Sequence, residues 1–259
     1  MTAHIPEIGK VGLEAMPPRK AILGPIAANI AFVMELTLVP LLLPAIQRLF
    51  DLSAGDLAWV FNSYGIAVAV GVLLGGWCGD LFNTRKVFGC GVTFFAVGSL
   101  LVSAANSFEM LIVGRAIQGL GAAIFSPLIP VLLTRVSPLK PGKVLIVWGS
   151  IAGYIAAFAP LFYGGLFDAQ RWNIAFVFIA TIALFALVIL HGRQGNDFDE
   201  ARFGRTTRYR KLFETPHLWM TFAYVFCTYG VITYYLFRLP VWLSDKEVNA
   251  ASVGLALTV

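Results

Sequence analysis

Charged residues are scarce in this sequence, and the scarcity excludes most soluble folds. Only 13% of the 259 residues are Asp, Glu, Lys or Arg, whereas 58% are hydrophobic, and the mean hydropathy is +0.79. An average soluble domain carries about 25% charged residues. Several apolar segments exceed the roughly 18 residues that a membrane-spanning helix requires. The composition therefore predicts an all-α, multi-pass membrane protein.

Residues that commonly build catalytic or metal sites are also few. The three histidines, His4, His191 and His217, lie near the amino terminus or at the ends of expected helices, and the three cysteines lack metal-ligand spacing. The sequence contains no recognisable nucleophile, base and orienter set and no phosphate-binding P-loop. We therefore expect no enzyme, no cofactor and no metal. The net charge of +5 lies mostly in loops and requires no nucleic acid partner.

The apolar segments divide the chain into four parts. We expect a cytosolic tail over residues 1–20, a six-helix domain over 21–191, a charged cytosolic linker over 192–216 and the start of a second helical domain over 217–259. The expected helices cover residues 21–46, 57–77, 87–105, 110–133, 144–167, 174–191 and 218–241. This is the layout of one half of a transporter built from two repeats, plus about one and a half helices of the other half. A fragment, a truncated reading frame and half of a two-chain assembly all fit this layout.

Basic residues are distributed unevenly between the two sides of the expected membrane domain. With a cytosolic amino terminus, most of the 19 Lys and Arg residues fall in cytosolic segments. The external segments hold only Arg48, Arg171, Arg238 and Lys246. Because basic loops stay in the cytosol, this bias predicts that the amino terminus is cytosolic.

One arginine, Arg115, lies inside the fourth apolar segment, where residues 111–123 read LIVGRAIQGLGAA. A charge at membrane depth costs about 2.5 to 3.5 kcal/mol and is normally kept for a function. Gln118 follows at i+3 and lies on the same helix face. Gly119 has no side chain, so a neighbouring helix can approach closely at this position. The spacing resembles motif B of the major facilitator superfamily. The alternative is an arginine that extends from near a helix end to the outer interface.

Glu35 is the only carboxylate deep in an expected helix. The segment ELTLVPLLLPAI, residues 35–46, is similar to the first helix of the drug:proton antiporter family of that superfamily, where an aspartate usually stands at this position. Residues 57–67 resemble the second helix of the same family, but the two additional spans of its longer members have no counterpart here. The resemblance therefore implies a twelve-helix antiporter.

Glu35 and Arg115 are candidates for a proton-coupling pair. Burial disfavours the charged form of a carboxyl group and a nearby cation favours it, so the neighbour controls proton uptake. At 1.5 Å per residue the two Cα levels differ by about 9 Å, within the joint reach of both side chains if their helices adjoin. The alternative is a glutamate that bonds only to a helix neighbour for packing.

A polar turn follows the second helix, where residues 76–86 read GWCGDLFNTRK. It resembles motif A of the superfamily, whose acidic residue and basic pair latch the two halves on the cytosolic side. Asn83 stands where glycine is usual and can adopt the same left-handed turn. An ordinary positive-inside loop is the alternative. The expected cytosolic gate comprises Gly76, Asp80, Arg85 and Lys86.

Small residues recur at helical spacing in two further helices. Gly71, Gly75 and Gly79 form a stripe in the second helix, which suits close helix contact. The fifth helix carries two small-residue faces, so we expect it to pack on both sides. Its segment APLFYGG, residues 159–165, is similar to motif C, which marks proton-driven antiporters; a merely kinked packing helix is the alternative. The expected hinge comprises Pro160, Gly164 and Gly165.

These features together predict a proton-coupled transporter that exports a small amphipathic compound or drug across the cell membrane by alternating access. Its partners would be the substrate, protons and the lipid bilayer, with a second half-transporter chain if the native protein is this short. A transporter of a metabolite or siderophore and a transport-inactive half protein are the alternatives. Polar and aromatic side chains at depth could line the substrate cavity. They are Asn29, Asn62, Tyr64, Ser126, Tyr154 and Tyr229.

Overall fold

A computed structural model describes residues 20–137, 139–166, 171–191, 214, 216–244 and 246, and every regular element within them is a helix. The helices are α1 (Lys20–Leu49), α2 (Ala54–Leu81), α3 (Thr84–Ser103), α4 (Phe108–Phe125), α5 (Leu128–Val136), α6 (Pro141–Leu166), α7 (Trp172–His191) and α9 (Pro216–Ser244). The all-α prediction is therefore confirmed. The expected tail and linker lie almost wholly outside the described residues.

Six helical segments of the described chain are long and apolar enough to cross a membrane. They are Ile22–Leu49, Ala54–Gly79, Thr84–Ser103, Phe108–Val136, Pro141–Phe158 and Trp172–His191. They coincide with the first six expected helices. The seventh expected segment forms helix α9, which is not among the six.

The fourth span is two helices and not the single helix that the sequence predicts. Helix α4 ends at Phe125 and α5 begins at Leu128, with a turn at Ser126 and Pro127 between them. Pro127 and Pro130 have no amide hydrogen, so neither can donate the i to i−4 bond that would continue α4. The backbone closes the break with a tighter bond from the Ile129 amide to the Ser126 carbonyl, at 3.2 Å.

Side-chain caps begin three of the helices. Ser53 and Asp56 form a reciprocal capping box at α2, and Ser107 accepts from the Met110 amide at α4. Asn83 caps α3, where its side-chain oxygen accepts from the Lys86 amide at 3.0 Å. Its φ is −56°, so the expectation of a left-handed turn at Asn83 is wrong. The side chain satisfies a free amide at the helix start, and no glycine-like conformation is needed.

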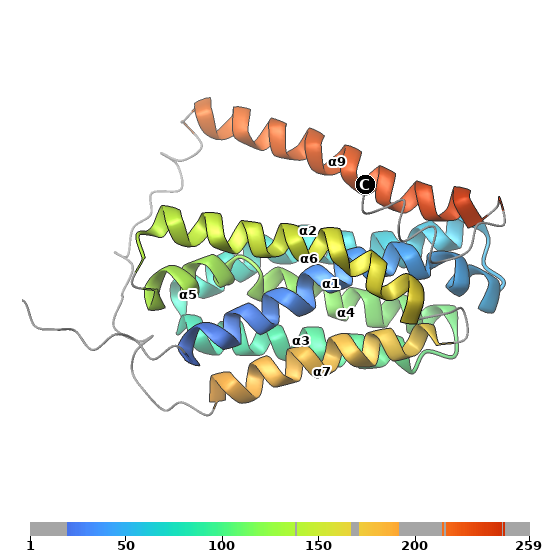
Figure 1. Ribbon diagram of the computed structural model, residues 1–259, viewed down its shortest axis with the longest axis horizontal. Coiled ribbons are helices and arrows are strands. Elements are labelled where there is room, and N and C mark those ends of the chain that lie inside the picture. The colour runs from blue at the N-terminus through green and yellow to red at the C-terminus, as the bar shows by residue number, and fades with distance from the viewer. Residues whose placement is uncertain are drawn as a thin grey trace, which may run out of the picture.

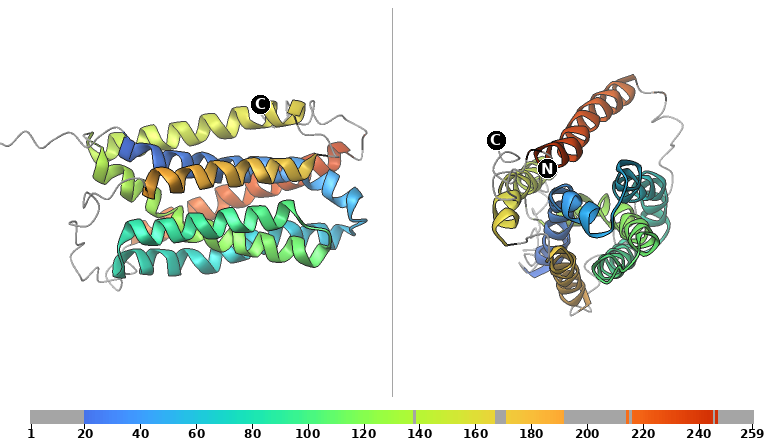
Figure 2. Two further views of the ribbon diagram at one scale, coloured as in Figure 1. Left: turned by 90° about the horizontal axis from the view of Figure 1, so that it is seen from below. Right: turned by 90° about the vertical axis from the view of Figure 1, so that its right-hand side faces the viewer.

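Helix α4 lies between α2 and α3 and packs closely on both (Figure 1). Helix α7 packs against α1 and α3, and α6 packs against α1, so that the six spans form one bundle (Figure 2). One end of α9 lies against α1, and its other end points away from the six spans (Figure 2).

The glycine stripe of the second helix is a helix contact, as predicted. A Cβ added at Gly75 would lie 2.6 Å from the Ala123 carbonyl oxygen, and one at Gly71 would lie 2.7 Å from the Ala123 side chain. On the fifth span, the expectation of packing on both small-residue faces is not met at the face that carries Gly149 and Gly153. A Cβ at Gly149 or Gly153 would meet nothing within 4 Å, so that small-residue face has no partner among the described residues.

Large apolar side chains cover much of the outer surface of the described bundle. Leu73 is 77% exposed and Trp77 56% on α2, and Ile146 is 70% exposed on α6. Contiguous apolar surface of this extent is unfavourable in water and favourable in contact with hydrocarbon or another apolar helix. Together with the six spans, this surface makes the chain a multi-pass membrane protein.

Candidate proton-coupling site

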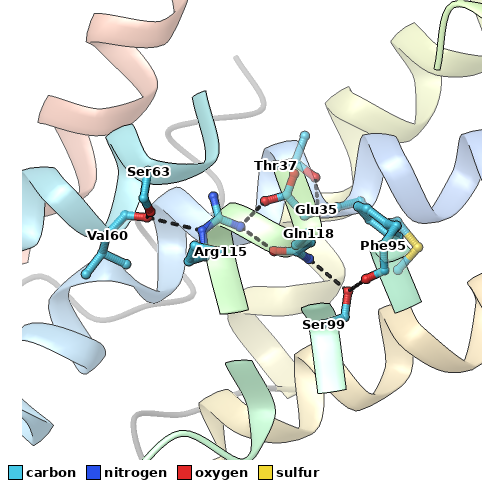
Figure 3. Close-up of polar contacts among 9 residues, drawn as sticks. Glu35, Thr37, Val60, Ser63, Phe95, Ser99, Arg115 and Gln118 are labelled. Carbon is cyan, nitrogen blue, oxygen red and sulfur yellow. Dashed lines mark hydrogen bonds and ion pairs between the residues drawn. The ribbon is translucent and has the colours of Figure 1, made fainter. Parts of the chain in front are cut away.

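Glu35 on α1 and Arg115 on α4 form an ion pair in the interior of the bundle (Figure 3). The Nη1 group of Arg115 donates to Oε1 of Glu35, and each side chain is 1% exposed. Helices α1 and α4 make few close backbone approaches, so two long side chains bridge the space between them. The structure thus brings together the two charged residues that the sequence places at membrane depth.

Arg115 has three further partners besides Glu35. Its Nη1 group donates to the Gln118 side-chain oxygen at 2.7 Å, and its Nε group donates to the Val60 carbonyl on α2 at 3.2 Å. The ring of Tyr64 lies 4.4 Å from the guanidinium carbon, within the range of a cation–π interaction. A buried charge is tolerated when it is paired and its donors are satisfied, and these contacts supply that requirement.

The polar network continues from Gln118 to α3 (Figure 3). The Gln118 side-chain amide donates to the Ser99 hydroxyl at 2.9 Å, and that hydroxyl donates to the Phe95 carbonyl at 2.8 Å. Ser99 and Gln118 are both fully buried. One chain of polar contacts therefore runs from α1 through α4 to α3.

Two polar atoms beside this network lack a hydrogen-bond partner among the described residues. They are Oε2 of Glu35 and the hydroxyl of Tyr64, both on buried side chains. Glu35 thus uses one oxygen for Arg115, and its other oxygen has no hydrogen-bond partner among the described residues.

Glycines bring the three helices close enough for this network. A Cβ added at Gly98 on α3 would lie 2.3 Å from the Gln118 backbone nitrogen. A Cβ at Gly119 on α4 would lie 2.5 Å from the Tyr64 carbonyl oxygen. Real Cβ atoms do not approach other atoms so closely, so the backbones can touch at these points only because the side chains are absent.

The residues expected to line a substrate cavity lie in different surroundings. Tyr64 belongs to the charged site, and Asn29 is buried and accepts the Trp148 indole N–H at 3.0 Å. Ser126 is half-buried at the break between α4 and α5, and Asn62 and Tyr154 are exposed. The side chain of Tyr229 lies outside the described residues.

One apolar cleft of about 150 Å³ lies among the ends of α1, α5 and α6. Asn29 and Trp148 are on its wall, beside aliphatic side chains of the three helices. Of the expected cavity residues, only Asn29 contributes to it. The cleft is therefore separate from the Glu35 and Arg115 pair.

The expected gate residues lie at the α2–α3 turn. Arg85 donates to the Leu190 carbonyl in the last turn of α7, and Lys86 is exposed. Gly76 lies near the end of α2, and a Cβ added there would meet nothing within 4 Å. The side chain of Asp80 lies outside the described part of the chain. Arg85 thus connects the turn to a helix of the same bundle.

The expected hinge residues, Pro160, Gly164 and Gly165, lie in the last turns of α6. The surroundings of their side chains lie outside the described part of the chain.

A profile of the Major Facilitator Superfamily matches residues 26–259, which includes five of the six spans in full, most of the first span and both charged residues of the buried pair. The chain belongs to the Major Facilitator Superfamily.

Relatives within the superfamily include resistance and efflux proteins. The chain is 31% identical to the tetracenomycin C resistance and export protein of Streptomyces glaucescens, over 72% of this chain and 34% of that protein. It is 35% identical to the puromycin resistance protein pur8 of Streptomyces alboniger, over 63% of this chain and 33% of that protein. It is 30% identical to the multidrug efflux pump SdrM of Staphylococcus aureus, over 61% and 35%. The chain spans about a third of the length of these relatives.

Solved structures of the superfamily share the fold. A D-xylose-proton symporter superimposes with a TM-score of 0.64 over 92% of this chain and 64% of that chain, at 17% identity. A peptide transporter in complex with sulfate superimposes with a TM-score of 0.61 over 90% of this chain and 50% of that chain, at 15% identity. At these identities the likeness concerns the helical architecture alone.

Two residues of the buried network, Ser99 and Val60, were not identified from the sequence. Ser99 is one of five serines in the described helices, and only its place opposite Gln118 distinguishes it. Val60 contributes a backbone carbonyl, which no side-chain pattern can reveal. The glycines next to these positions are the one available signal, because small residues mark where helices touch.

Proposed function

We propose that this chain supplies the proton-coupling bundle of a secondary transporter that exports a small amphipathic compound, a drug or an antibiotic, across the cell membrane. The single observation that carries the proposal is the buried Glu35 and Arg115 pair at the centre of six apolar spans. An ionisable pair at membrane depth marks a substrate or proton pathway. The resistance and efflux relatives supply the substrate class and the direction.

Protonation of Glu35 is the proposed coupling step. A neutral Glu35 no longer attracts Arg115, whereas the guanidinium keeps its contacts with the Val60 carbonyl and the Gln118 oxygen. The buried cation therefore keeps two hydrogen bonds when the proton arrives, which reduces the penalty of about 3 to 5 kcal/mol for breaking a buried pair. Proton uptake thus weakens the link between α1 and α4 and favours one orientation of the bundle.

The substrate would compete with the proton for Glu35. An amphipathic cation can bind a carboxylate through its charge and apolar helix surface through its body. Binding then releases the proton from Glu35, and reprotonation from the other side of the membrane releases the substrate. Export driven by a proton gradient follows from this exchange, with access alternating between the two sides.

The remaining segments complete the proposed transporter. Residues 21–191 form the amino-terminal bundle, residues 192–216 link it to the second bundle, and residues 217–259 begin that bundle. We place the amino terminus in the cytosol, because with this orientation most of the basic residues fall in cytosolic segments. The turn with Gly76, Asp80, Arg85 and Lys86 gates the cytosolic side, and Pro160, Gly164 and Gly165 let α6 flex.

Glu35→Gln tests the proposal because it mimics the protonated carboxyl group. Everted membrane vesicles from cells that express the protein would be energised, and proton efflux on addition of a panel of amphipathic cations would be measured. We expect Glu35→Gln to abolish substrate-dependent proton movement while protein levels in the membrane stay unchanged. Glu109→Gln is the matched control, because Glu109 is an exposed carboxylate at the start of α4. Proton movement equal to that of the wild type in Glu35→Gln would refute the coupling role.

A further inference from the structure

Ser99 controls the orientation of the Gln118 side chain. A serine hydroxyl has a single hydrogen, and that of Ser99 is used in the bond to the Phe95 carbonyl. The hydroxyl oxygen can therefore only accept from Gln118, so it selects the amide NH₂ group of that side chain. The Gln118 carbonyl oxygen consequently points the other way, toward Nη1 of Arg115.

The opposite orientation of Gln118 would be unfavourable for two reasons. It would turn the amide NH₂ group toward the Arg115 guanidinium, which has donors only. It would also leave the carbonyl oxygen facing a hydroxyl whose hydrogen is already used. Both side chains are fully buried, so solvent cannot satisfy either group. Packing at Gly98, against the Gln118 backbone, keeps the two helices at this distance.

Gln118 in turn sets how strongly Arg115 depends on Glu35. Nη1 of Arg115 donates to both Gln118 and Glu35, so the neutral amide shares the cation with the carboxylate. If the amide loses the Ser99 oxygen that anchors it, its bond to Arg115 is held less firmly, and the cation relies more on Glu35. The charged form of Glu35 is then favoured, and its protonation requires a lower pH.

Few other titratable groups face Glu35 in the described part of the chain. Arg115 approaches from α4 and Tyr64 from α2. Helix α7 carries only His191, in its last turn, and α3 carries Arg85, Lys86 and Cys90 in its first two turns. Tyr154 on α6 is exposed. The Ser99 and Gln118 contacts are thus the neutral polar groups that adjust the Glu35 and Arg115 pair from the α3 side.

We propose that Ser99 is a positioning residue that fixes the Gln118 amide toward Arg115 and thereby sets the pH at which Glu35 takes up a proton. The inference rests on the proposed function only for its consequence in transport. The protonation of Glu35 itself can be measured whether or not the protein transports.

Infrared titration of the purified protein tests the inference directly. The carbonyl band of protonated Glu35 would be identified by its absence in Glu35→Gln and followed with pH. We expect Ser99→Ala to move its midpoint to lower pH by about half to one unit, the equivalent of one neutral hydrogen bond. Ser99→Thr keeps the hydroxyl and should restore the wild-type midpoint. Ser103→Ala is the matched control, because Ser103 donates to the Leu100 carbonyl on the same helix and does not reach Gln118.

A double-mutant comparison separates positioning from a general effect on folding. In a Gln118→Met background, Ser99→Ala should cause no further shift, because its effect passes through the amide. A midpoint in Ser99→Ala equal to that of Ser103→Ala, or a full shift that persists with Gln118→Met, would overturn the inference. Wild-type proton movement in Glu35→Gln vesicles would instead overturn the proposed function and leave the infrared result standing.

Discussion

Arg115 donates its Nε hydrogen to the backbone carbonyl of Val60, 3.2 Å away on α2, in a bond that does not involve Glu35. The guanidinium is therefore attached to α2 as well as to its own helix. When Glu35 is neutralised, the contact that weakens is the one with α1. The proposed coupling thus changes the position of α1 relative to α4 and α2, whereas Arg115 stays in place.

Arg115→Lys should abolish most transport although the charge is kept. A lysine has one compact ammonium group and cannot reach the Val60 carbonyl, Gln118 and Glu35 in the same fixed geometry. Loss of one or two hydrogen bonds to a charged group, about 1.5 to 3 kcal/mol each, predicts a fall of more than about tenfold in the uptake rate of everted vesicles. Arg171→Lys, at an exposed position before α7, is the control. Normal uptake by Arg115→Lys would show that charge alone suffices.

Tyr64→Phe should shift the pH dependence of transport in the direction opposite to Ser99→Ala. The ring over Arg115 is kept and only the hydroxyl near Glu35 is removed. The hydroxyl and Oε2 of Glu35 both lack another partner among the described residues, and a phenol hydroxyl can donate to a carboxylate that carries a charge, so its loss disfavours the charged form of Glu35. The half-maximal pH should rise by about one unit. Tyr154→Phe, which removes an exposed hydroxyl from α6, should leave the profile unchanged. A shift to lower pH in Tyr64→Phe would contradict the assigned role.

The sequence was sufficient to predict the spans and to name Glu35 and Arg115 as a candidate pair, but not to show that their helices adjoin. Long apolar runs set the number of helices, and an isolated charge in such a run indicates a buried partner of opposite sign. Glu35 and Arg115 could be matched by depth because helical rise is constant. The depth of a residue in the membrane does not determine which way its side chain points around the helix axis. The partner of Arg115 on α2 and that of Gln118 on α3 therefore could not be assigned from the sequence.

Other features depend on contacts that no local pattern contains. Asn62 and Tyr154 were chosen as cavity residues and are exposed in the described chain, so their place in a substrate cavity stays a prediction. The break after Phe125 could have been expected from Pro127 and Pro130, because two prolines in four residues remove successive helix bonds. Arg85 resembles a residue that joins the two halves, whereas in the structure it donates to the Leu190 carbonyl within one bundle. Its role depends on where α7 ends in space.

Gly98→Ala should destabilise the bundle. The added methyl group would lie 2.3 Å from the Gln118 backbone nitrogen, so α3 and α4 must separate or bend. Overpacking of this kind costs about 1 to 3 kcal/mol, and we expect a lower thermal midpoint of the purified protein and less protein in the membrane. Gly65→Ala is the control, because a Cβ there would meet nothing within 4 Å and alanine favours a helix. Equal midpoints for the two variants would show that the helices are not in contact at Gly98.

Arg85→Ala should loosen the last turn of α7. The guanidinium donates to the Leu190 carbonyl, one of the carbonyls that a helix leaves unpaired at its end. A cation at this end stabilises a helix by about 0.3 to 1 kcal/mol, so amide hydrogen exchange in the last turn should become about two- to fivefold faster. Lys86→Ala removes the neighbouring exposed cation and should leave exchange in α7 unchanged. If both variants accelerate exchange equally, the effect is one of general charge, and the bond to Leu190 does not hold the end of α7.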